Sequence, residues 1–468
     1  MGTRNRIFDL QLTPSSSNTS PPLAFRFFYA VEAHENASDK AQEVAANNAR
    51  VGLAALLSEV LVVSSDLEGP GSSATDRARA LFLRGRLQES TGAMDAGASG
   101  AKTLACAEEA LKKAAKLDPG LDGAWNCLAQ LLWKKGNLDG AKSCYQAVLN
   151  RGPNKKTLQA MSMLFRSLAK SKAAPGTDEQ KNYIAESMVY AKAAVKLDLT
   201  DGYSWYQVGT AYMSAFFAEG ASDRTKLAQA LKAYENAERG GPNGIGRSKG
   251  LGLADHPDLH FNRAIVYRYV EDYGAALESF AKAAALDPNL PVAGEVDAVT
   301  AALAKLDDGC RGVGTMFKSK RLATLRAALL CGGGVYSGSS NAVDAAVPKE
   351  YEDQSLAALA EGTNEGVAVR VRIAMDATAE DLLNLSYVVV DKDGVLAALS
   401  VYGLEDGAIR QTSTLTLLRP NVRDVDATRG GRRFRFRLIR IDLPKQILVG
   451  GQMPVGRNAR PRMASTNM

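Results

Sequence analysis

Between Trp125 and Pro153, apolar and small residues recur at every third or fourth position, which predicts two amphipathic helices. Gly136 and Asn137 separate these helices, and Pro153, which lacks a backbone N–H, ends the second one. Small residues let the helices approach each other while aromatic residues fill the remaining space, as in the tetratricopeptide repeat of about 34 residues. The positions that set the pattern are Trp125, Leu128, Ala129, Leu132, Ala141, Tyr145 and Val148.

The same pattern recurs on both sides of this stretch and predicts four or five repeats. One helical hairpin cannot bury its apolar faces alone, so neighbouring repeats must stack on it. The chain is therefore expected to form a mostly α-helical solenoid. The further copies of the pattern lie at 78–119, 158–197, 205–242 and 264–288.

From Gly366 onward the period changes from helical to alternating, which predicts β-strands. The turn Asp391-Lys392-Asp393-Gly394 between two such runs indicates a hairpin. Five short strands in roughly a hundred residues suit a small closed β-barrel, for which the OB fold is the best interpretation. The predicted strands lie at 367–373, 387–390, 395–402, 412–418 and 433–441.

The chain of 468 residues is long enough for two or three domains. A Gly/Ser-rich stretch at 332–340 predicts a flexible joint before the strands. The expected order is a disordered tail at 1–22, N-terminal capping helices at 23–70, a tetratricopeptide repeat solenoid at 71–306, a basic helix and flexible linker at 307–345, an OB-fold domain at 346–455 and a disordered tail at 456–468.

Composition gives little support for catalysis or for a membrane span. The hydrophobic fraction of 46% is ordinary, and no run approaches the roughly 20 apolar residues that a membrane helix needs. The five cysteines are scattered and odd in number, which favours a reducing compartment over a disulfide framework. With three histidines and no Gly-rich phosphate loop, we expect no enzyme activity, no cofactor and no bound metal. The net charge of +6 is modest and indicates acidic partners only where it is clustered.

Polar side chains on the first helices of the repeats are candidates for peptide binding, because these helices line the concave side of a solenoid. Arg166 falls on one such helix, and Asn262 and Arg263 fall on another. A guanidinium can hold a carboxylate through two parallel hydrogen bonds, and Asn262 can pair with peptide backbone groups. The alternative is that Arg166 and Arg263 are solvated groove charges or ion pairs within the solenoid.

Two basic stretches follow the predicted repeats. The cluster from Lys318 to Arg321 lies beside flexible glycines, where it can bind phosphate through counterion release. A solvated face or a localisation signal is the alternative. In the second stretch, arginines alternate with Phe434 and Phe436, which places the phenylalanines on one face of a strand. We expect those rings in the barrel core rather than as platforms for nucleic-acid bases.

Several stretches resemble one family in loop and polar positions as well as in packing positions. They are GAWNCLAQLLWKKGNLDGAKSCYQAVL, SMLFRSL, DGYSWYQVG and HPDLHFNRAIVYRYVEDYGAALESFAKAAALDP. Over 104–330, and more faintly through the predicted barrel, the chain resembles the tetratricopeptide repeat protein 5 (Strap) family. The resemblance implies a non-enzymatic, mainly cytoplasmic adaptor that recognises the N-terminal peptide of nascent tubulin at the ribosome. It also implies that the adaptor triggers decay of tubulin mRNA through decay machinery recruited by a further adaptor.

The resemblance assigns roles to individual residues of the groove. Arg166 matches an arginine that pairs with an acidic residue of the nascent peptide, and Asp258 matches an aspartate that pairs with its basic residue. A third acidic position of the family aligns with Val292, so the complete clamp is not conserved in this sequence. Glu295, one helical turn later, is the candidate replacement.

The lysines that face the ribosome in this family match Lys318 and Lys320, and Arg321 extends the expected contact with ribosomal RNA near the exit tunnel. Two other functions stay open. Family members are also described as nuclear scaffolds that join a histone acetyltransferase to a transcription factor, which implies a nuclear pool. A chaperone co-factor that grips acidic carboxy-terminal peptides is the second alternative, and the acidic Asp258 argues against it.

Overall fold

The computed structural model describes Ser58 and residues 72–94, 97–221, 223–244, 246, 250–312, 319–330, 347–378, 384–404, 407–410 and 413–454. The predicted tails at 1–22 and 456–468 lie outside these residues, as do the capping helices at 23–70 apart from Ser58 and the joint at 332–340. The chain divides into two compact units, Met1–Leu168 with Val189–Asp198 and Ala169–Met188 with Leu199–Met468.

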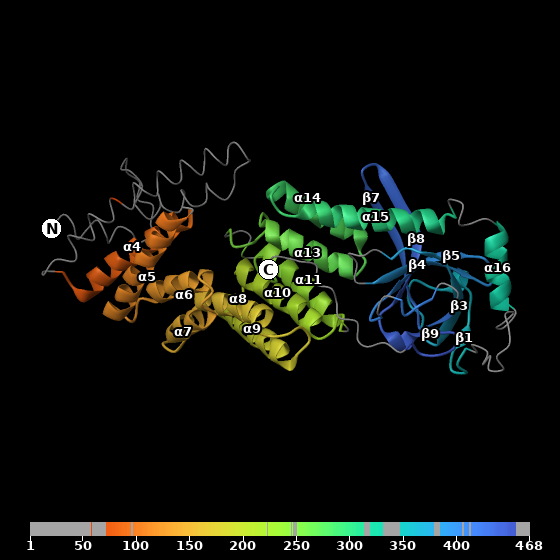
Figure 1. Cartoon of the computed structure of the whole chain (residues 1–468), viewed down its shortest axis with the longest axis horizontal. Helices are drawn as coiled ribbons and strands as arrows, with labels where there is room; N and C mark the ends of the chain where they lie inside the picture. The colour runs from red at the N-terminus through yellow and green to blue at the C-terminus, as the bar shows by residue number, and fades with distance from the viewer. Residues whose placement is uncertain are drawn as a thin grey trace. The chain divides into compact units, whose positions relative to one another are not determined.

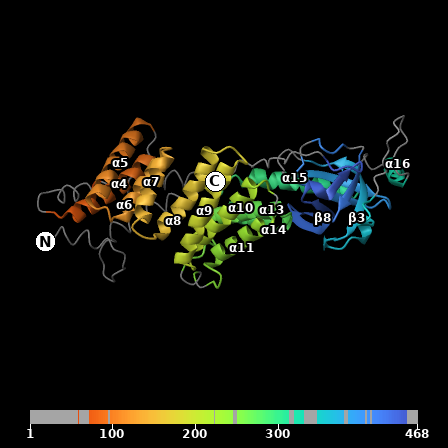
Figure 2. The same cartoon turned by 90° about the horizontal axis from the view of Figure 1, so that it is seen from below.

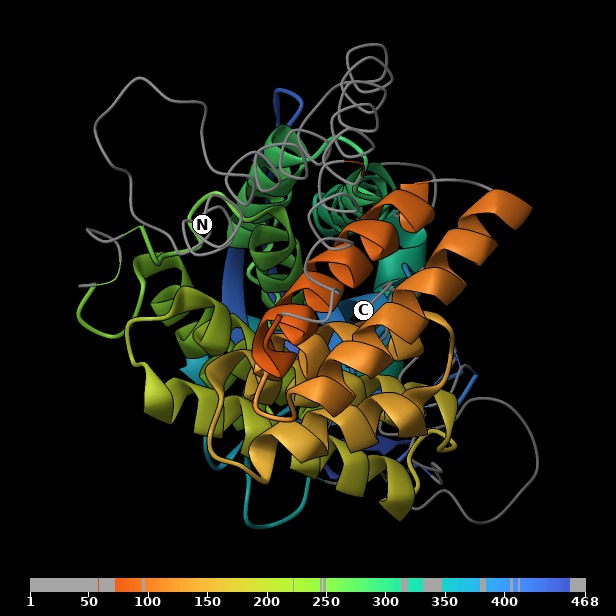
Figure 3. The same cartoon turned by 90° about the vertical axis from the view of Figure 1, so that its left-hand side faces the viewer.

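Helical hairpins build the first unit. Helix α4 (Ala74–Met94) and helix α5 (Ala98–Leu117) lie side by side (Figures 2 and 3). They pack closely because Gly85 faces Leu111: a Cβ atom at Gly85 would lie 2.7 Å from the Leu111 Cγ. Helices α6 (Asp122–Lys134) and α7 (Leu138–Leu149) form the next hairpin, and α8 (Lys155–Ser171) and α9 (Asp178–Leu197) follow along the chain.

The α6–α7 hairpin confirms the repeat predicted between Trp125 and Pro153. Ala129 and Ala141 are fully buried, as is the Tyr145 side chain that fills the space between the helices. In the turn, Gly136 has φ +80°, a conformation that glycine adopts without a steric penalty. The Asn137 side chain then caps α7 by accepting a hydrogen bond of 2.9 Å from the Gly140 backbone N–H.

The second unit continues the repeats with α10 (Gly202–Ala218), α11 (Thr225–Arg239), α13 (Pro257–Tyr269), α14 (Tyr273–Leu286) and α15 (Val292–Cys310). At the predicted small position of α10, a Cβ atom on Gly209 would lie 2.5 Å from the ring of Tyr234, which is fully buried. Asp201 and Asp272 cap α10 and α14 through their side chains. The expected repeats at 205–242 and 264–288 are therefore confirmed.

A sheet follows the repeats and packs against them (Figure 1). Helix α16 (Ser319–Leu330) precedes it, and the strands run in the order β2-β7-β8-β5-β4-β3-β6-β9, with β1 beside β3. Their bounds are β1 (Glu352–Asp353), β2 (Gly362–Thr363), β3 (Val367–Asp376), β4 (Leu385–Asp391), β5 (Leu396–Val401), β6 (Thr414–Leu418), β7 (Asn421–Arg429), β8 (Arg432–Ile441) and β9 (Ile447–Val449).

All five predicted strands are present, but the expected closed barrel is wrong. Within the described part of the chain, no ladder joins β2 to β9, so the sheet is open at these two edges. Both edge strands are only two to three residues long, which leaves few backbone groups for a closing ladder. The predicted hairpin is confirmed by antiparallel pairing of β4 with β5, for example Val388 opposite Ala398.

Apolar side chains from both faces of the sheet are buried. One cluster lies within the sheet and includes Val371, Leu399 and Ile439. The other joins β8 to the repeats, because Phe434 and Phe436 pack in the same cluster as the side chains of α13, α14 and α15. The two rings are 1% and 6% exposed, so they are buried as predicted, but they pack against the repeats and not in the core of a barrel.

A buried polar network also fixes the sheet to the repeats. The Arg440 guanidinium on β8 donates to the Tyr269 carbonyl at 2.7 Å and pairs with Glu271 at 3.1 Å and Asp442 at 2.6 Å. The Tyr402 hydroxyl donates to Glu271 at 2.9 Å, and its ring lies 4.1 Å from the Arg440 guanidinium. Burial raises the pKa of Tyr402 well above its usual value, so the hydroxyl stays a donor to Glu271.

Further features bear on the predicted class of protein. None of the described helices is long and apolar enough to cross a membrane. Within the same residues, no three His, Cys, Asp or Glu side chains gather as metal ligands would. Cys106, Cys127, Cys144 and Cys310 are free thiols.

Candidate functional site

An aromatic cluster gathers on the first helices of two consecutive repeats in the second unit. Tyr203 and Tyr206 lie one turn apart on α10, with ring centroids 5.9 Å from each other. His256, the residue before α13, lies 6.5 Å from the Tyr203 ring and 5.5 Å from the Tyr206 ring. Three neighbouring rings offer flat surfaces on which a guanidinium or an extended peptide can lie.

Polar groups of α13 border this aromatic cluster. Asn262, 7% exposed, donates a hydrogen bond of 2.9 Å to the Tyr206 hydroxyl. Asp258, one turn earlier on the same face, is exposed. Burial lowers the pKa of His256, while the Asp258 carboxylate acts in the opposite direction. The His256 imidazole is therefore neutral near pH 7, and Asp258 supplies the negative charge beside the rings.

The structure places Arg166 on α8, in the first unit, with a half-buried side chain. Its guanidinium donates to the Ser162 hydroxyl at 2.9 Å and to the Ser162 carbonyl at 3.3 Å. These contacts hold one edge of the guanidinium against its own helix and restrict its rotamers. A fixed guanidinium loses less conformational entropy when it binds a carboxylate. Asp258 lies in the other compact unit.

Arg263 has the contacts expected of an ion pair within the solenoid. Its guanidinium pairs with Glu238 of α11 at 2.5 Å and lies 3.0 Å from the Nδ1 atom of His260. Burial would raise the pKa of Glu238, but Arg263 and Lys282 lower it below its usual range. Arg263 therefore neutralises Glu238, which is the alternative that the sequence left open for this residue.

Glu295 is also engaged within the repeats. It lies in the first turn of α15 and forms an ion pair with Arg268, whose side chain is 7% exposed. Val292, where the resemblance to the family implies an acidic position, is 4% exposed and packs in the core. A carboxylate is therefore present near the start of α15, but it is paired with an internal guanidinium.

Two of the expected ribosome-binding residues, Lys320 and Arg321, lie at the start of α16. Lys320 is exposed, whereas Lys318 lies outside the described residues. Arg321 donates a hydrogen bond of 3.2 Å to the Ala374 carbonyl on β3. Arg326 donates to the Lys392 carbonyl at 3.2 Å, so both ends of α16 are attached to the sheet. Arg321 positions the helix, and Lys320 is presented to solvent beside it.

The arginines of β8 pair with carboxylates of the same unit. Arg432 contacts Asp308 at 2.6 Å, and Arg437 contacts Asp424 at 3.2 Å. Arg433 pairs with Asp426, and this contact lowers the pKa of the Asp426 carboxyl. These ion pairs offset the positive charge that a single-stranded nucleic acid would need on this strand.

The aromatic cluster was not predicted from the sequence, because charged residues on the first helices were the candidates for peptide binding and Tyr203 and Tyr206 were assigned no role. Tyr203 and Tyr206 precede and follow Trp205, and only Trp205 belongs to the repeat pattern. An aromatic pair on a first helix, outside the packing positions, is the signal that could have found the cluster.

Comparisons with known proteins agree with this architecture. A model of the tetratricopeptide repeat protein 5 OB fold domain matches residues 350–462, and a tetratricopeptide repeat model matches residues 257–290. Tetratricopeptide repeat protein 5 from Bos taurus is 33% identical over 362 residues, covering 76% of this chain and 78% of that protein. The Homo sapiens protein is 32% identical over 365 residues, with 76% and 78% covered.

Fold and site together define a tetratricopeptide repeat scaffold with a carboxy-terminal OB fold domain, the kind of protein that binds other proteins through its repeats. The chain belongs to the tetratricopeptide repeat protein 5 family.

Proposed function

We propose that this protein is a cytoplasmic adaptor that binds the N-terminal peptide of nascent tubulin as it leaves the ribosome and promotes decay of the tubulin mRNA. The observation that carries the proposal is the group of Asp258, Tyr203, Tyr206 and His256 on the first helices of the repeats. A carboxylate beside aromatic rings suits a peptide arginine, which can pair with the carboxylate and stack on a ring.

Arg166 supplies the opposite charge. Its guanidinium is half-buried and fixed by Ser162, and it suits an acidic peptide residue. A peptide such as Met-Arg-Glu-Ile carries an arginine that suits Asp258 and a glutamate that suits Arg166. Membership of the tetratricopeptide repeat protein 5 family, for which the sequence resemblance implies these roles, supports the assignment.

Docking on the ribosome is the second part of the proposal. Lys320 is exposed at the start of α16, and Lys318 precedes it in the sequence. Lysines bind ribosomal RNA through its phosphates and release counterions, so this contact weakens steeply with salt. Two weak contacts made by one protein strengthen each other through effective concentration, so neither the RNA nor the peptide contact needs to be tight.

Peptide binding tests the proposal directly. We expect Arg166→Ala to weaken binding of a Met-Arg-Glu-Ile peptide by about 1.5–3 kcal/mol, the range for hydrogen bonds to charged groups. Asp258→Asn should weaken it similarly, because it removes the charge and keeps the shape. Isothermal titration calorimetry measures both effects on the full chain.

Matched controls lie on the same elements. Lys170 is an exposed cation of α8, and Asp255 is an exposed carboxylate just before α13. Lys170→Ala and Asp255→Asn should leave the affinity unchanged. Unchanged affinity in Arg166→Ala and Asp258→Asn would refute the groove assignment. Binding of a peptide ending in Glu-Glu-Val-Asp, lost on substitution of Asn262, would favour the chaperone co-factor instead.

A further inference from the structure

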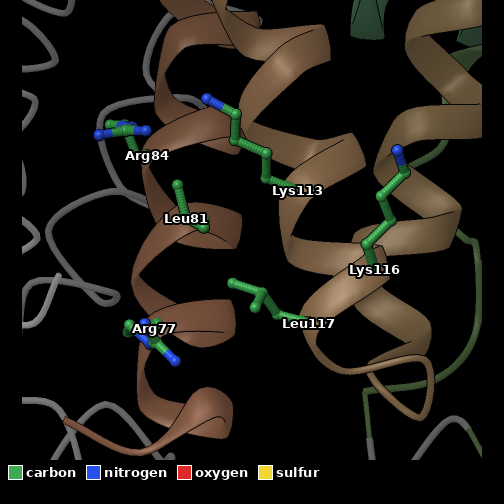
Figure 4. Close-up of a pocket in the computed structure, with 6 residues that line it drawn as sticks. All are labelled: Arg77, Leu81, Arg84, Lys113, Lys116 and Leu117. Carbon is green, nitrogen blue, oxygen red and sulfur yellow. The ribbon is translucent and has the colours of Figure 1, made fainter. Parts of the chain in front are cut away.

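A basic hollow with an apolar floor lies on the α4–α5 hairpin of the first unit (Figure 4). Its volume is about 450 Å³. The lining side chains are Arg77, Leu81, Arg84, Lys113, Lys116 and Leu117. The two leucines lie between the cations of the two helices, so apolar surface and positive charge occur together (Figure 4).

Helical spacing explains how the sequence builds this hollow. Arg77, Leu81 and Arg84 follow each other at intervals of four and three residues and so share one face of α4. Lys113 and Lys116 do the same on α5, three residues apart. The two faces meet because the helices pack closely at Gly85, as described above. On α4 the two arginines are separated by about 10 Å along the helix axis.

Two lysines of the hollow lack carboxylate partners among the described residues. Lys113 and Lys116 form no ion pair with the part of the chain that the structure describes. The Nε atom of Arg77 is buried and has no hydrogen-bond partner there. The nearby carboxylate of Glu108 is taken by Lys112 and Lys135, contacts that lower its pKa. The positive charge of Lys113 and Lys116 is therefore not neutralised by any carboxylate of the described residues.

We propose that this hollow binds an acidic segment of a partner protein that carries leucine-sized apolar side chains. The guanidinium of Arg77 suits a carboxylate, which can accept two hydrogen bonds from it. Leu117 is 38% exposed and Leu81 is 4% exposed, so an apolar side chain would cover Leu117 and lie over Leu81. A nucleic acid fits less well, because no aromatic ring lines the described hollow and leucines offer nothing to a phosphate.

This inference does not depend on the peptide that the repeats bind elsewhere. A scaffold acts by holding two partners at once, and a separate basic surface would let it keep the second partner while the first is bound. Charge guides the encounter, and the apolar contact selects acidic segments that also carry leucine-like residues.

The probe is a short fluorescein-labelled peptide in which glutamates and leucines alternate at helical spacing, titrated with the full chain by fluorescence anisotropy. We expect saturable binding that weakens with salt. Lys113→Glu with Lys116→Glu should weaken it by about tenfold or more, because attraction becomes like-charge repulsion at two positions. Leu117→Ala should weaken it several-fold. Replacing the leucines of the probe with alanine should also weaken its binding to the parent protein. The affinity should fall to that of the original probe for the Lys113→Glu, Lys116→Glu variant.

The matched control is Lys102→Glu with Lys196→Glu, which changes the net charge equally at exposed positions outside the hollow. It should bind the probe as the parent protein does. A benzophenone-bearing probe should crosslink to α4 or α5 in the parent protein, which tests the site without any substitution. The proposal would be overturned if the parent protein did not bind the probe, or if both double variants lost binding equally. Crosslinks elsewhere in the chain would also overturn it, as would competition by poly(U) but not by unlabelled peptide.

Discussion

At the scale of single residues, two helical glycines have opposite surroundings, Gly209 in the middle of α10 and Gly294 in the first turn of α15. A Cβ atom on Gly209 would lie 2.5 Å from the ring of Tyr234, whereas a Cβ atom on Gly294 of α15 would meet nothing within 4 Å. The difference shows which small residues hold the repeats together and which do not. Close packing at Gly209 also sets the approach of α10, the helix that carries Tyr203 and Tyr206.

Alanine substitutions separate the two cases. Alanine gains up to about 1 kcal/mol over glycine in a helix interior. At Gly209 this gain is outweighed by overpacking against Tyr234, which costs about 1–3 kcal/mol, so the free energy of unfolding should fall. Gly294→Ala should instead raise it, because nothing opposes the propensity gain. Urea unfolding of both variants checks this, and stabilisation by Gly209→Ala would contradict the packing account.

At the scale of elements, the buried pair of Arg440 on β8 and Glu271 after α13 joins the sheet to the repeats. Glu271 is 2% exposed and has φ +61°, which is unusual for a residue other than glycine. Burial disfavours the charged guanidinium, but Glu271, Tyr402 and Asp442 raise the pKa of Arg440 above its usual value. Each charge is tolerated because the other is present.

Removing one partner should therefore be costly. Arg440→Met leaves Glu271 buried and unpaired, and we expect a loss of about 3–5 kcal/mol in the free energy of unfolding. Adding Glu271→Gln should recover part of that loss, because the amide is neutral and can still accept from Tyr402. Arg433→Met, which removes an exposed pair with Asp426, should leave stability unchanged. A cost in Arg440→Met as small as in Arg433→Met would contradict the account.

The elements differ in how far they could be predicted. The repeats were predictable because Ala129, Gly209 and their aromatic partners obey a short local period. Strand β7 was missed because its alternation is interrupted: Val422 and Val425 are buried with two charged residues between them. Arg423 explains the interruption, since it donates to the Val270 carbonyl of the repeats, a long-range contact that no local pattern reveals.

The candidate site was predicted only in part for a related reason. Arg166 stood out as a charged residue on a first helix, whereas Asp258 was assigned only through the resemblance to the family. The neighbourhood of Asp258 needed the fold, because His256 comes from the repeat after the one that holds Tyr203 and Tyr206. The Arg263–Glu238 pair likewise joins two repeats, and the sequence offered it only as an alternative.

At the scale of the whole molecule, the proposed function needs a surface that holds the ribosome as well as one that reads the nascent chain. Lys318→Glu with Lys320→Glu should abolish co-sedimentation with ribosomes, because repulsion from RNA phosphates replaces attraction. Affinity for the isolated Met-Arg-Glu-Ile peptide should stay unchanged. The reversal of Lys102 and Lys196 serves here as the charge-matched control. If the reversed variant sediments with ribosomes at low salt as the parent does, the docking assignment is wrong.

The central claim is that Arg166 and Asp258 read two neighbouring charges of one peptide, each residue its own. Double-mutant cycles between protein and peptide test this most directly. The protein variants are Arg166→Ala and Asp258→Asn, and the peptide variants carry glutamine in place of the arginine or the glutamate. Titration calorimetry measures the affinity of each combination. The account predicts coupling energies of about 0.5–3 kcal/mol between Arg166 and the peptide glutamate and between Asp258 and the peptide arginine. It predicts little coupling for the two crossed combinations. Zero coupling in the matched combinations, or equal coupling in all four, would contradict it.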